Sequence, residues 1–129
     1  MQYVVSASLL VVAVIHLIPL QGVLGSDRLA SLYGALPFDE PNLAILMRHR
    51  AVLFGLLGMS LVVAAFRPAL QTLAFIAGFV SVISYLWLAW SVGGYNAPLG
   101  RVFAADVVAL VCLAVGAAAH AYLELQVRV

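Results

Sequence analysis

Four long apolar segments, separated by breaks that contain polar residues, glycine or proline, dominate the pattern of this chain. Each is about as long as the roughly 20 residues that an α-helix needs to cross the hydrocarbon core of a membrane. Two of the three breaks are short, which favours antiparallel neighbours. We therefore predict an all-α fold over residues 1–129. It is a single integral membrane domain, an antiparallel bundle of four transmembrane helices at residues 3–23, 42–66, 68–92 and 99–122.

The first break is longer and has a pattern of its own. Ser26 is suited to cap a short helix in which Leu29, Leu32 and Tyr33 share one face, and Gly34 is suited to end it. An apolar face of this kind is typical of a helix that lies flat in the membrane interface. The pattern predicts a short interfacial helix between the first two spans.

Composition supports the membrane assignment. Of the 129 residues, 66% are hydrophobic and 9% are charged, whereas about 25% of the residues of a soluble domain are charged. A net charge of +1 does not supply the basic surface that nucleic acid requires, so we expect no nucleic-acid partner. All the basic side chains are arginine, and this bias, with abundant Ala, Val, Leu and Gly, indicates a GC-rich bacterial genome and an inner-membrane location.

The predicted orientation depends on which arginines are counted. Both termini and Arg67 lie on one side of the membrane, and the first and third breaks lie on the other, which we call the loop side. Counting every arginine places the loop side in the cytoplasm. Leaving out Arg48, Arg50 and Arg101, which fall inside predicted spans, reverses that result. We favour cytoplasmic termini.

Helical periodicity predicts which faces of the third and fourth spans point into the bundle. At about 100° per residue, each span has a stripe of small and polar residues, and small residues let helices approach closely in lipid. Trp87 and Trp90 point away from the stripe, as membrane-interface anchors do, and Arg101 points to another face, where it reaches lipid headgroups. The stripes are Gln71, Ala74, Gly78, Ser81 and Tyr85 in the third span, and Asp106, Ala109, Leu113, Ala117, His120 and Glu124 in the fourth.

The second span carries three consecutive ionisable residues, Arg48, His49 and Arg50. Their side chains fan out over about 200° around the helix axis, so they do not all face one cavity. Arg48 lies nearest to the small-residue face of this span, whereas Arg50 faces either a neighbouring helix or the interface. That small face consists of Ala51, Gly55 and Gly58.

Polar residues of four different spans fall in one layer near the loop side. His16, Arg50, Tyr85 and Asp106 each lie about seven to nine residues from the loop-side end of their span, which is roughly 10–14 Å along a helix. A charged side chain at the centre of a membrane helix costs about 2.5–3.5 kcal/mol, so it marks function by default. The alternative is a structural ion pair between Asp106 and either Arg48 or Arg50.

This layer predicts a pocket that opens towards the loop side and binds a small apolar molecule, such as a quinone or a lipid. Asp106 and Arg48 would form its charged floor. A histidine beside a carboxylate titrates near neutrality, so proton transfer is open to His16 as acid or base, with Tyr85 as a hydrogen-bond donor. The candidate catalytic residues are His16, Tyr85 and Asp106, and the candidate ligand-binding residues are Arg48, His49 and Arg50.

Three other functions are compatible with the sequence. His16 and His49 are candidate axial ligands of a haem, and Asp106 with His120 is a candidate path in a proton-coupled exporter. The chain also suits a homo-oligomer or a structural subunit of a larger membrane complex. No cofactor is required, although haem or a quinone is compatible, and three histidines on three spans without a ligand spacing do not predict a metal site.

The layout resembles that of the small DoxX-like four-helix membrane proteins of bacteria. The likeness lies in a short helix in the first loop, at residues 27–34 (DRLASLYG), and in a second span that is led by arginine and contains glycine, at residues 48–58 (RHRAVLFGLLG). It implies a membrane subunit linked to thiol or thiosulfate oxidation with quinone. Cys112 is the only cysteine, so the chain lacks the pair that thiol redox chemistry needs, and that activity is not carried over.

Overall fold

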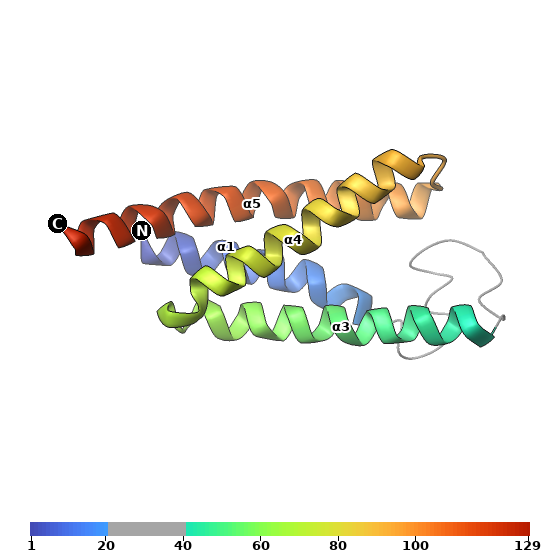
Figure 1. Cartoon of the computed structure of the whole chain (residues 1–129), viewed down its shortest axis with the longest axis horizontal. Coiled ribbons are helices and arrows are strands. Elements are labelled where there is room, and N and C mark those ends of the chain that lie inside the picture. The colour runs from blue at the N-terminus through green and yellow to red at the C-terminus, as the bar shows by residue number, and fades with distance from the viewer. Residues whose placement is uncertain (21–40) are drawn as a thin grey trace.

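The computed structural model of the protein describes residues 1–20 and 41–129 (Figure 1). Those residues form four long α-helices and no strand. The predicted interfacial helix and the last residues of the first predicted span, 21–23, lie outside the described residues. The helices are α1 (Gln2–Leu17), α3 (Pro41–Ala65), α4 (Pro68–Val92) and α5 (Ala97–Arg128).

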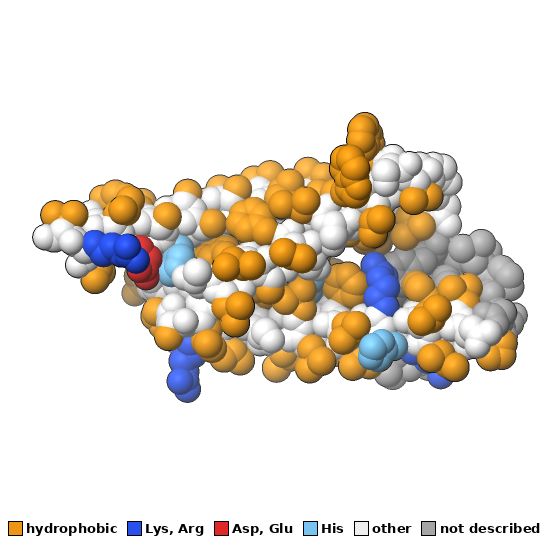
Figure 2. All heavy atoms as spheres, in the orientation of Figure 1, with side chains coloured by type: hydrophobic (Ala, Val, Ile, Leu, Met, Phe, Trp, Pro, Cys, Tyr) orange, Lys and Arg blue, Asp and Glu red, His pale blue; other side chains and the backbone are white. Residues whose placement is uncertain are grey.

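All four helices are long and apolar enough to cross a membrane, with α1 counted to Leu20. Their most apolar stretches have mean hydropathies between 1.5 and 2.4. Hydrophobic side chains cover most of the visible face, and charged side chains gather towards the two ends (Figure 2). The all-helical class and the four candidate spans are therefore confirmed, and the pattern is that of an integral membrane protein.

Two prolines explain where α1 ends and where α4 begins. Pro19 has no N–H to give to the carbonyl of Ile15, and α1 ends at Leu17, followed by a 3₁₀ turn over residues 18–20. Pro68 opens α4 directly after the turn at Arg67, at a helix position where a missing N–H costs little. Both termini and this turn lie at one end of the molecule (Figure 1).

The opposite end holds the connection between α4 and α5. Gly93 and Gly94 both have a φ of 66°, a backbone conformation that favours glycine, and they reverse the chain. Asn96 then caps α5, because its side-chain oxygen accepts a hydrogen bond from the N–H of Leu99 at 3.1 Å. This capped turn fixes the start of α5 beside the end of α4.

The last helix is longer than the sequence pattern predicts. We expected the fourth span to end at Tyr122, but α5 continues to Arg128 and has 32 residues, or about 48 Å of helix. The added segment contains leucine, glutamate and glutamine, which are good helix formers, and neither glycine nor proline interrupts it. The hydrophobic pattern marked the apolar part of this helix, not its end.

The short helix α1 packs against both α3 and α5, while α4 packs against α5 and α3. In Figure 1, α4 runs from the end of α3 at the Arg67 turn to the start of α5 at the opposite end. The centre of the bundle is apolar, and its largest fully buried aliphatic side chains come from all four helices. They are Leu9, Leu61, Leu113, Val5, Val12 and Val82.

Glycine allows two of these helix contacts to be close. A Cβ atom on Gly58 of α3 would lie 2.8 Å from Leu17, and one on Gly116 of α5 would lie 2.7 Å from the Cβ atom of Ser8. Both contacts bring a helix against α1, as expected of small residues between membrane helices. The predicted stripe of α4 also faces inward, since Gln71, Ala74 and Gly78 are buried and Ser81 and Tyr85 are half-buried.

Candidate functional site

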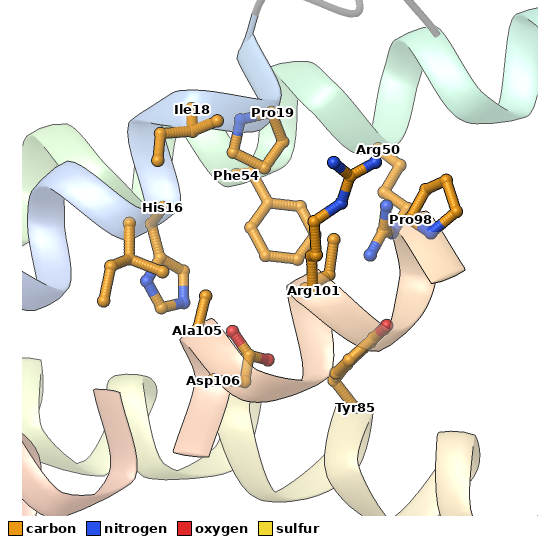
Figure 3. Close-up of a pocket in the computed structure, with 12 residues that line it drawn as sticks. His16, Ile18, Pro19, Arg50, Phe54, Tyr85, Pro98, Arg101, Ala105 and Asp106 are labelled. Atoms are coloured by element: carbon orange, nitrogen blue, oxygen red, sulfur yellow. The ribbon is translucent and has the colours of Figure 1, made fainter. Parts of the chain in front are cut away.

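A cavity of about 330 Å³ lies between the four helices, in the half of the bundle away from the termini (Figure 3). Most of its wall is aliphatic or aromatic, and five of its side chains are polar or charged. The apolar lining consists of Ile15, Ile18, Pro19, Phe54, Pro98, Val102 and Ala105, and the polar lining consists of His16, Arg50, Tyr85, Arg101 and Asp106. Four of the six predicted site residues therefore line one cavity.

Asp106 provides the negative charge of the cavity. It lies in the third turn of α5, and only 6% of its surface is exposed. The positive charge of Arg50, on α3, acts on this carboxylate. Figure 3 shows the Asp106 carboxylate pointing into the cavity, on the same side of it as the His16 ring. A carboxylate and a guanidinium from different helices thus face the same space.

Arg50 is held over an aromatic ring of its own helix. Its guanidinium carbon lies 4.6 Å from the centroid of the Phe54 ring, one turn further along α3. A cation over the face of an aromatic ring is attracted by the negative charge density of that face. The contact keeps a half-buried arginine in the wall of the cavity and orients its guanidinium group.

The ring of Phe54 also contacts the histidine of α1. The centroids of the His16 and Phe54 rings are 5.5 Å apart, with 31° between their planes. His16 and Arg50 therefore both use Phe54 as a neighbour. The imidazole, the phenyl ring and the guanidinium form one packed group that joins α1 to α3.

The hydrogen bonds of His16 define its tautomer. Its Nδ1 atom lies 2.9 Å from the carbonyl oxygen of Val12, and its Nε2 atom lies 3.1 Å from Oγ of Ser81 on α4. A carbonyl oxygen only accepts, so Nδ1 carries a hydrogen and donates it. In the neutral ring, Nε2 then accepts a hydrogen bond from the hydroxyl of Ser81. The sequence predicted an inward-facing His16 but not this partner.

Tyr85 connects the end of α4 to the start of α5. Its hydroxyl donates a hydrogen bond to the carbonyl oxygen of Leu99 at 3.3 Å, and its half-buried side chain lines the cavity. The first four carbonyl groups of a helix normally accept bonds from within the helix, so this bond is an additional one. Tyr85 thus holds the first turn of α5 at the cavity wall.

Arg48 and His49 are not where we expected them. Both side chains are exposed, and neither lines the cavity. Gly58 makes a close contact with Leu17 of α1 and Gly55 makes one with Leu20 of the turn that follows it, so the face that these glycines define is a packing contact. The cavity forms on the adjoining flank of α3, and for that reason Arg50 replaces Arg48 as its cation.

Arg101 and Phe54 are lining residues that the sequence analysis missed. We expected Arg101 to reach lipid headgroups from another face of α5, but it lines the cavity although its side chain is largely exposed. The side chains of Arg50 and Arg101 extend into the cavity from opposite walls, α3 and α5 (Figure 3). The spacing of Phe54, four residues after Arg50, was the available signal for the aromatic contact.

Metal and haem binding find little support in this arrangement. The described residues contain no group of three or more His, Cys, Asp or Glu side chains that could hold a metal ion. His16 is buried in the bundle whereas His49 is exposed, so the structure does not bring the two candidate haem ligands to one cavity. His120 lies elsewhere on α5, with its Nε2 atom 2.9 Å from Oγ1 of Thr72.

Comparison of the chain with protein families, with curated proteins and with solved structures gave no match. The resemblance to the DoxX-like proteins therefore stays a prediction from the sequence. The function that follows is argued from the cavity alone.

Proposed function

We propose that the protein binds a small amphiphilic molecule, quinone-like or lipid-like, in the cavity between the four helices. Its support is the composition of the wall, in which apolar side chains surround a few convergent polar groups. Ligand sites typically have this composition and volumes of about 300–1,000 Å³. The cavity, at about 330 Å³, is large enough for a ring or a headgroup.

The main support for the proposal is that Arg50 of α3 and Asp106 of α5 both line one cavity. A buried ion pair contributes little net stability, because the cost of removing both charges from water offsets their attraction. A pair retained only to hold the bundle together would be better packed. Charges that line a cavity lie within reach of a ligand bound in it.

Proton transfer to or from the ligand would use one particular atom of His16. Its Nδ1–H is engaged by the carbonyl of Val12, whereas Nε2 accepts from the hydroxyl of Ser81. A ligand hydroxyl that replaced Ser81 would meet a nitrogen able to take its proton. In this proposal, Tyr85 and Asp106 bind and orient the ligand, and His16 is the acid or base.

The membrane setting that we propose is the bacterial inner membrane, with four antiparallel spans and cytoplasmic termini. The absence of lysine and the richness in Ala, Val, Leu and Gly support the bacterial source. The cavity then lies in the periplasmic half of the bilayer. This setting suits a ligand that partitions into lipid.

The two other functions have less support. An exporter path along α5 would have to join Asp106 to His120, which are 14 residues or about 21 Å apart, and His120 is bound to Thr72. A structural subunit of a larger complex requires no cavity. No contact among the described residues favours either function over ligand binding.

The test is to purify the protein from its native membrane in mild detergent, extract the bound small molecules and identify them by mass spectrometry. The variant Ala105→Phe places a ring in the cavity wall, and Ala104→Phe places the same ring on the neighbouring exposed position. We expect one molecule to accompany the wild type and Ala104→Phe, in near-stoichiometric amount, and to be lost from Ala105→Phe. Equal amounts in all three proteins, or none in any, would contradict the proposal.

A further inference from the structure

We infer that the ligand of this cavity is a neutral hydroxyl compound, whose O–H group donates a hydrogen bond to the carboxylate of Asp106. The inference rests on the proposed function and narrows it to molecules with a hydroxyl headgroup. Three features of the cavity support it. They are the carboxylate of Asp106, the acceptor nitrogen that His16 adds on the same side, and the two arginines that line the same space.

The carboxylate of Asp106 makes no hydrogen bond and no ion pair with any residue in the described part of the chain. Its side chain is only 6% exposed, and the carboxylate points into the cavity (Figure 3). The charge of Arg50 acts on it without a direct hydrogen bond. An ionised carboxylate only accepts hydrogen bonds. A ligand group that contacts Asp106 must therefore supply the hydrogen.

His16 adds a second acceptor on the same side of the cavity. The hydrogen on its Nδ1 atom is donated to the carbonyl of Val12, and Nε2 of the neutral ring accepts from the hydroxyl of Ser81. The neutral imidazole thus presents no N–H to the cavity. A ligand carbonyl, ether or carboxylate placed there would bring one acceptor against others.

A ligand without a donor would leave Asp106 in an unfavourable state. A molecule that fills the cavity separates the carboxylate from water, and an apolar group against it would leave a buried charge unpaired. Sites that bind a hydroxyl through a buried polar group reject an analogue without that hydroxyl far more strongly than an apolar pocket rejects a missing methylene. We therefore expect Asp106 to determine which ligands bind.

The arginines decide between a neutral and a charged donor. Hydroxyl and ammonium groups both donate, but Arg50 and Arg101 line the same cavity of about 330 Å³. In the view of Figure 3, both guanidinium groups lie on the side of the cavity towards Pro98, away from His16. Like charges brought together away from water repel strongly. A neutral hydroxyl satisfies the carboxylate and adds no positive charge.

The rest of the lining suits an apolar body behind the hydroxyl. It includes Ile15, Ile18 and Val102, and ligand sites commonly combine such walls with a few polar groups that fix the orientation. A phenol joins a hydroxyl to a rigid apolar ring, and its O–H is a stronger donor than that of an aliphatic alcohol. Alkylphenols are therefore the probes of choice.

The test compares four probes that share one ring and one alkyl tail. Binding to the full chain in phosphatidylcholine nanodiscs is measured at neutral pH by titration calorimetry, and titrations of empty nanodiscs are subtracted. The probes are para-pentylphenol, its methyl ether para-pentylanisole, the cation para-pentylbenzylamine and the anion para-pentylbenzoate.

We expect the phenol to bind about ten- to hundredfold more tightly than the anisole, which is the effect of one hydrogen bond to a charged group. The amine and the benzoate should both bind more weakly than the phenol. Equal binding of the phenol and the anisole would overturn the inference, and so would tighter binding of either charged probe.

Asp106→Asn tests whether this carboxylate is the acceptor. The amide keeps the shape of the side chain and loses the charge, so the preference for the phenol over the anisole should fall to about threefold or less, with binding of the anisole unchanged. A purely structural role would weaken both probes alike. An undiminished preference in the folded variant would overturn the inference, and circular dichroism checks the fold.

Glu124→Gln is the matched control, because it removes a carboxylate from an exposed position of the same helix. It should keep the wild-type preference for the phenol. Failure of this inference is distinguishable from failure of the proposed function. If the anisole binds as tightly as the phenol and Ala105→Phe abolishes both, the cavity binds a ligand and only the hydroxyl assignment is wrong. If no probe binds, the inference fails together with the proposed function.

Discussion

The guanidinium carbon of Arg50 lies 4.6 Å from the centroid of the Phe54 ring, on the same face of α3. The same ring lies 5.5 Å from the imidazole of His16 on α1. Phe54 therefore orients the cation of the cavity and packs against its candidate acid or base. Phe54 has no ionisable group, but it links the ionisable side chains of His16 and Arg50.

Replacing Phe54 by leucine removes the aromatic face and keeps most of the apolar volume. A cation–π contact contributes about 0.5–2 kcal/mol, so ligand binding in the cavity should weaken by roughly two- to thirtyfold with little change in stability. Phe66→Leu, at an exposed position beyond the end of α3, is the control. Quantitative mass spectrometry of the co-purified molecule measures the change, and full retention by Phe54→Leu would show that the ring does not position Arg50 for the ligand.

Charge coupling between Arg50 and Asp106 is measurable by a double-mutant cycle. Arg50→Gln and Asp106→Asn should give an interaction free energy of about 0.5–3 kcal/mol in the free energy of unfolding in mixed detergent micelles. Arg48→Gln, on an exposed side chain, should be additive with Asp106→Asn to within about 0.5 kcal/mol. Stronger coupling of Arg48 than of Arg50 would reverse the assignment of the cavity cation.

Ser81→Ala removes the hydroxyl that bonds to Nε2 of His16, and the His16 side chain is only 1% exposed. A buried acceptor left without its donor costs about 1–3 kcal/mol, and we expect a loss of stability in that range. Ser84→Ala is the matched control, because Ser84 is exposed and its hydroxyl donates to the carbonyl of Ser81 at 3.0 Å. Equal effects of the two substitutions on the free energy of unfolding would refute the His16–Ser81 bond.

Gly116→Ala tests the close contact between α5 and α1. The added Cβ would lie 2.7 Å from the Cβ of Ser8 and 3.0 Å from the ring of Phe75, so the helices must move apart, at a cost of about 1–3 kcal/mol. Gly100→Ala on the same helix meets only Tyr95, at 3.7 Å. It should stabilise α5 by up to about 1 kcal/mol. The midpoint temperature of thermal unfolding should therefore fall for Gly116→Ala and rise for Gly100→Ala. A shift of both variants in the same direction would contradict this packing.

Helical periodicity predicted the inward faces well where small residues continue along a helix. Gln71, Ala74 and Gly78 of α4 are buried as expected, and Trp87 and Trp90 are exposed on the other side. The pattern is informative because membrane helices approach each other along small residues, which leaves large side chains in lipid. The inward position of Asp106 followed from the same reasoning on α5.

The identity of the cavity cation did not follow from the pattern. Small residues mark where a helix touches its neighbour, whereas a cavity forms beside such a contact, on a flank about 100° away on α3. Arg48 extends the contact face and Arg50 lies on the flank, although only one residue, His49, lies between them in the sequence. Which flank borders a cavity depends on where α4 diverges from α3, and that divergence is a property of the whole bundle.

The length of arginine side chains is the second reason why the sequence did not predict all the lining residues of the cavity. Arg101 and Asp106 are five residues apart, or about 140° around α5, and a helical projection places them on different faces. Both line the cavity, because it lies at the start of α5 and a long arginine side chain extends around the helix into it. A projection of Cβ directions does not include that reach.

The most direct test of the ligand-binding cavity is an experimental structure of the protein purified from its native membrane, at a resolution that shows side chains. The account predicts continuous non-protein density between Arg50, Tyr85 and Asp106, which line the cavity. A bundle in which the side chains of α1, α3 and α5 meet and fill this space, with Arg50 paired to Asp106 and no room for another molecule, would contradict it.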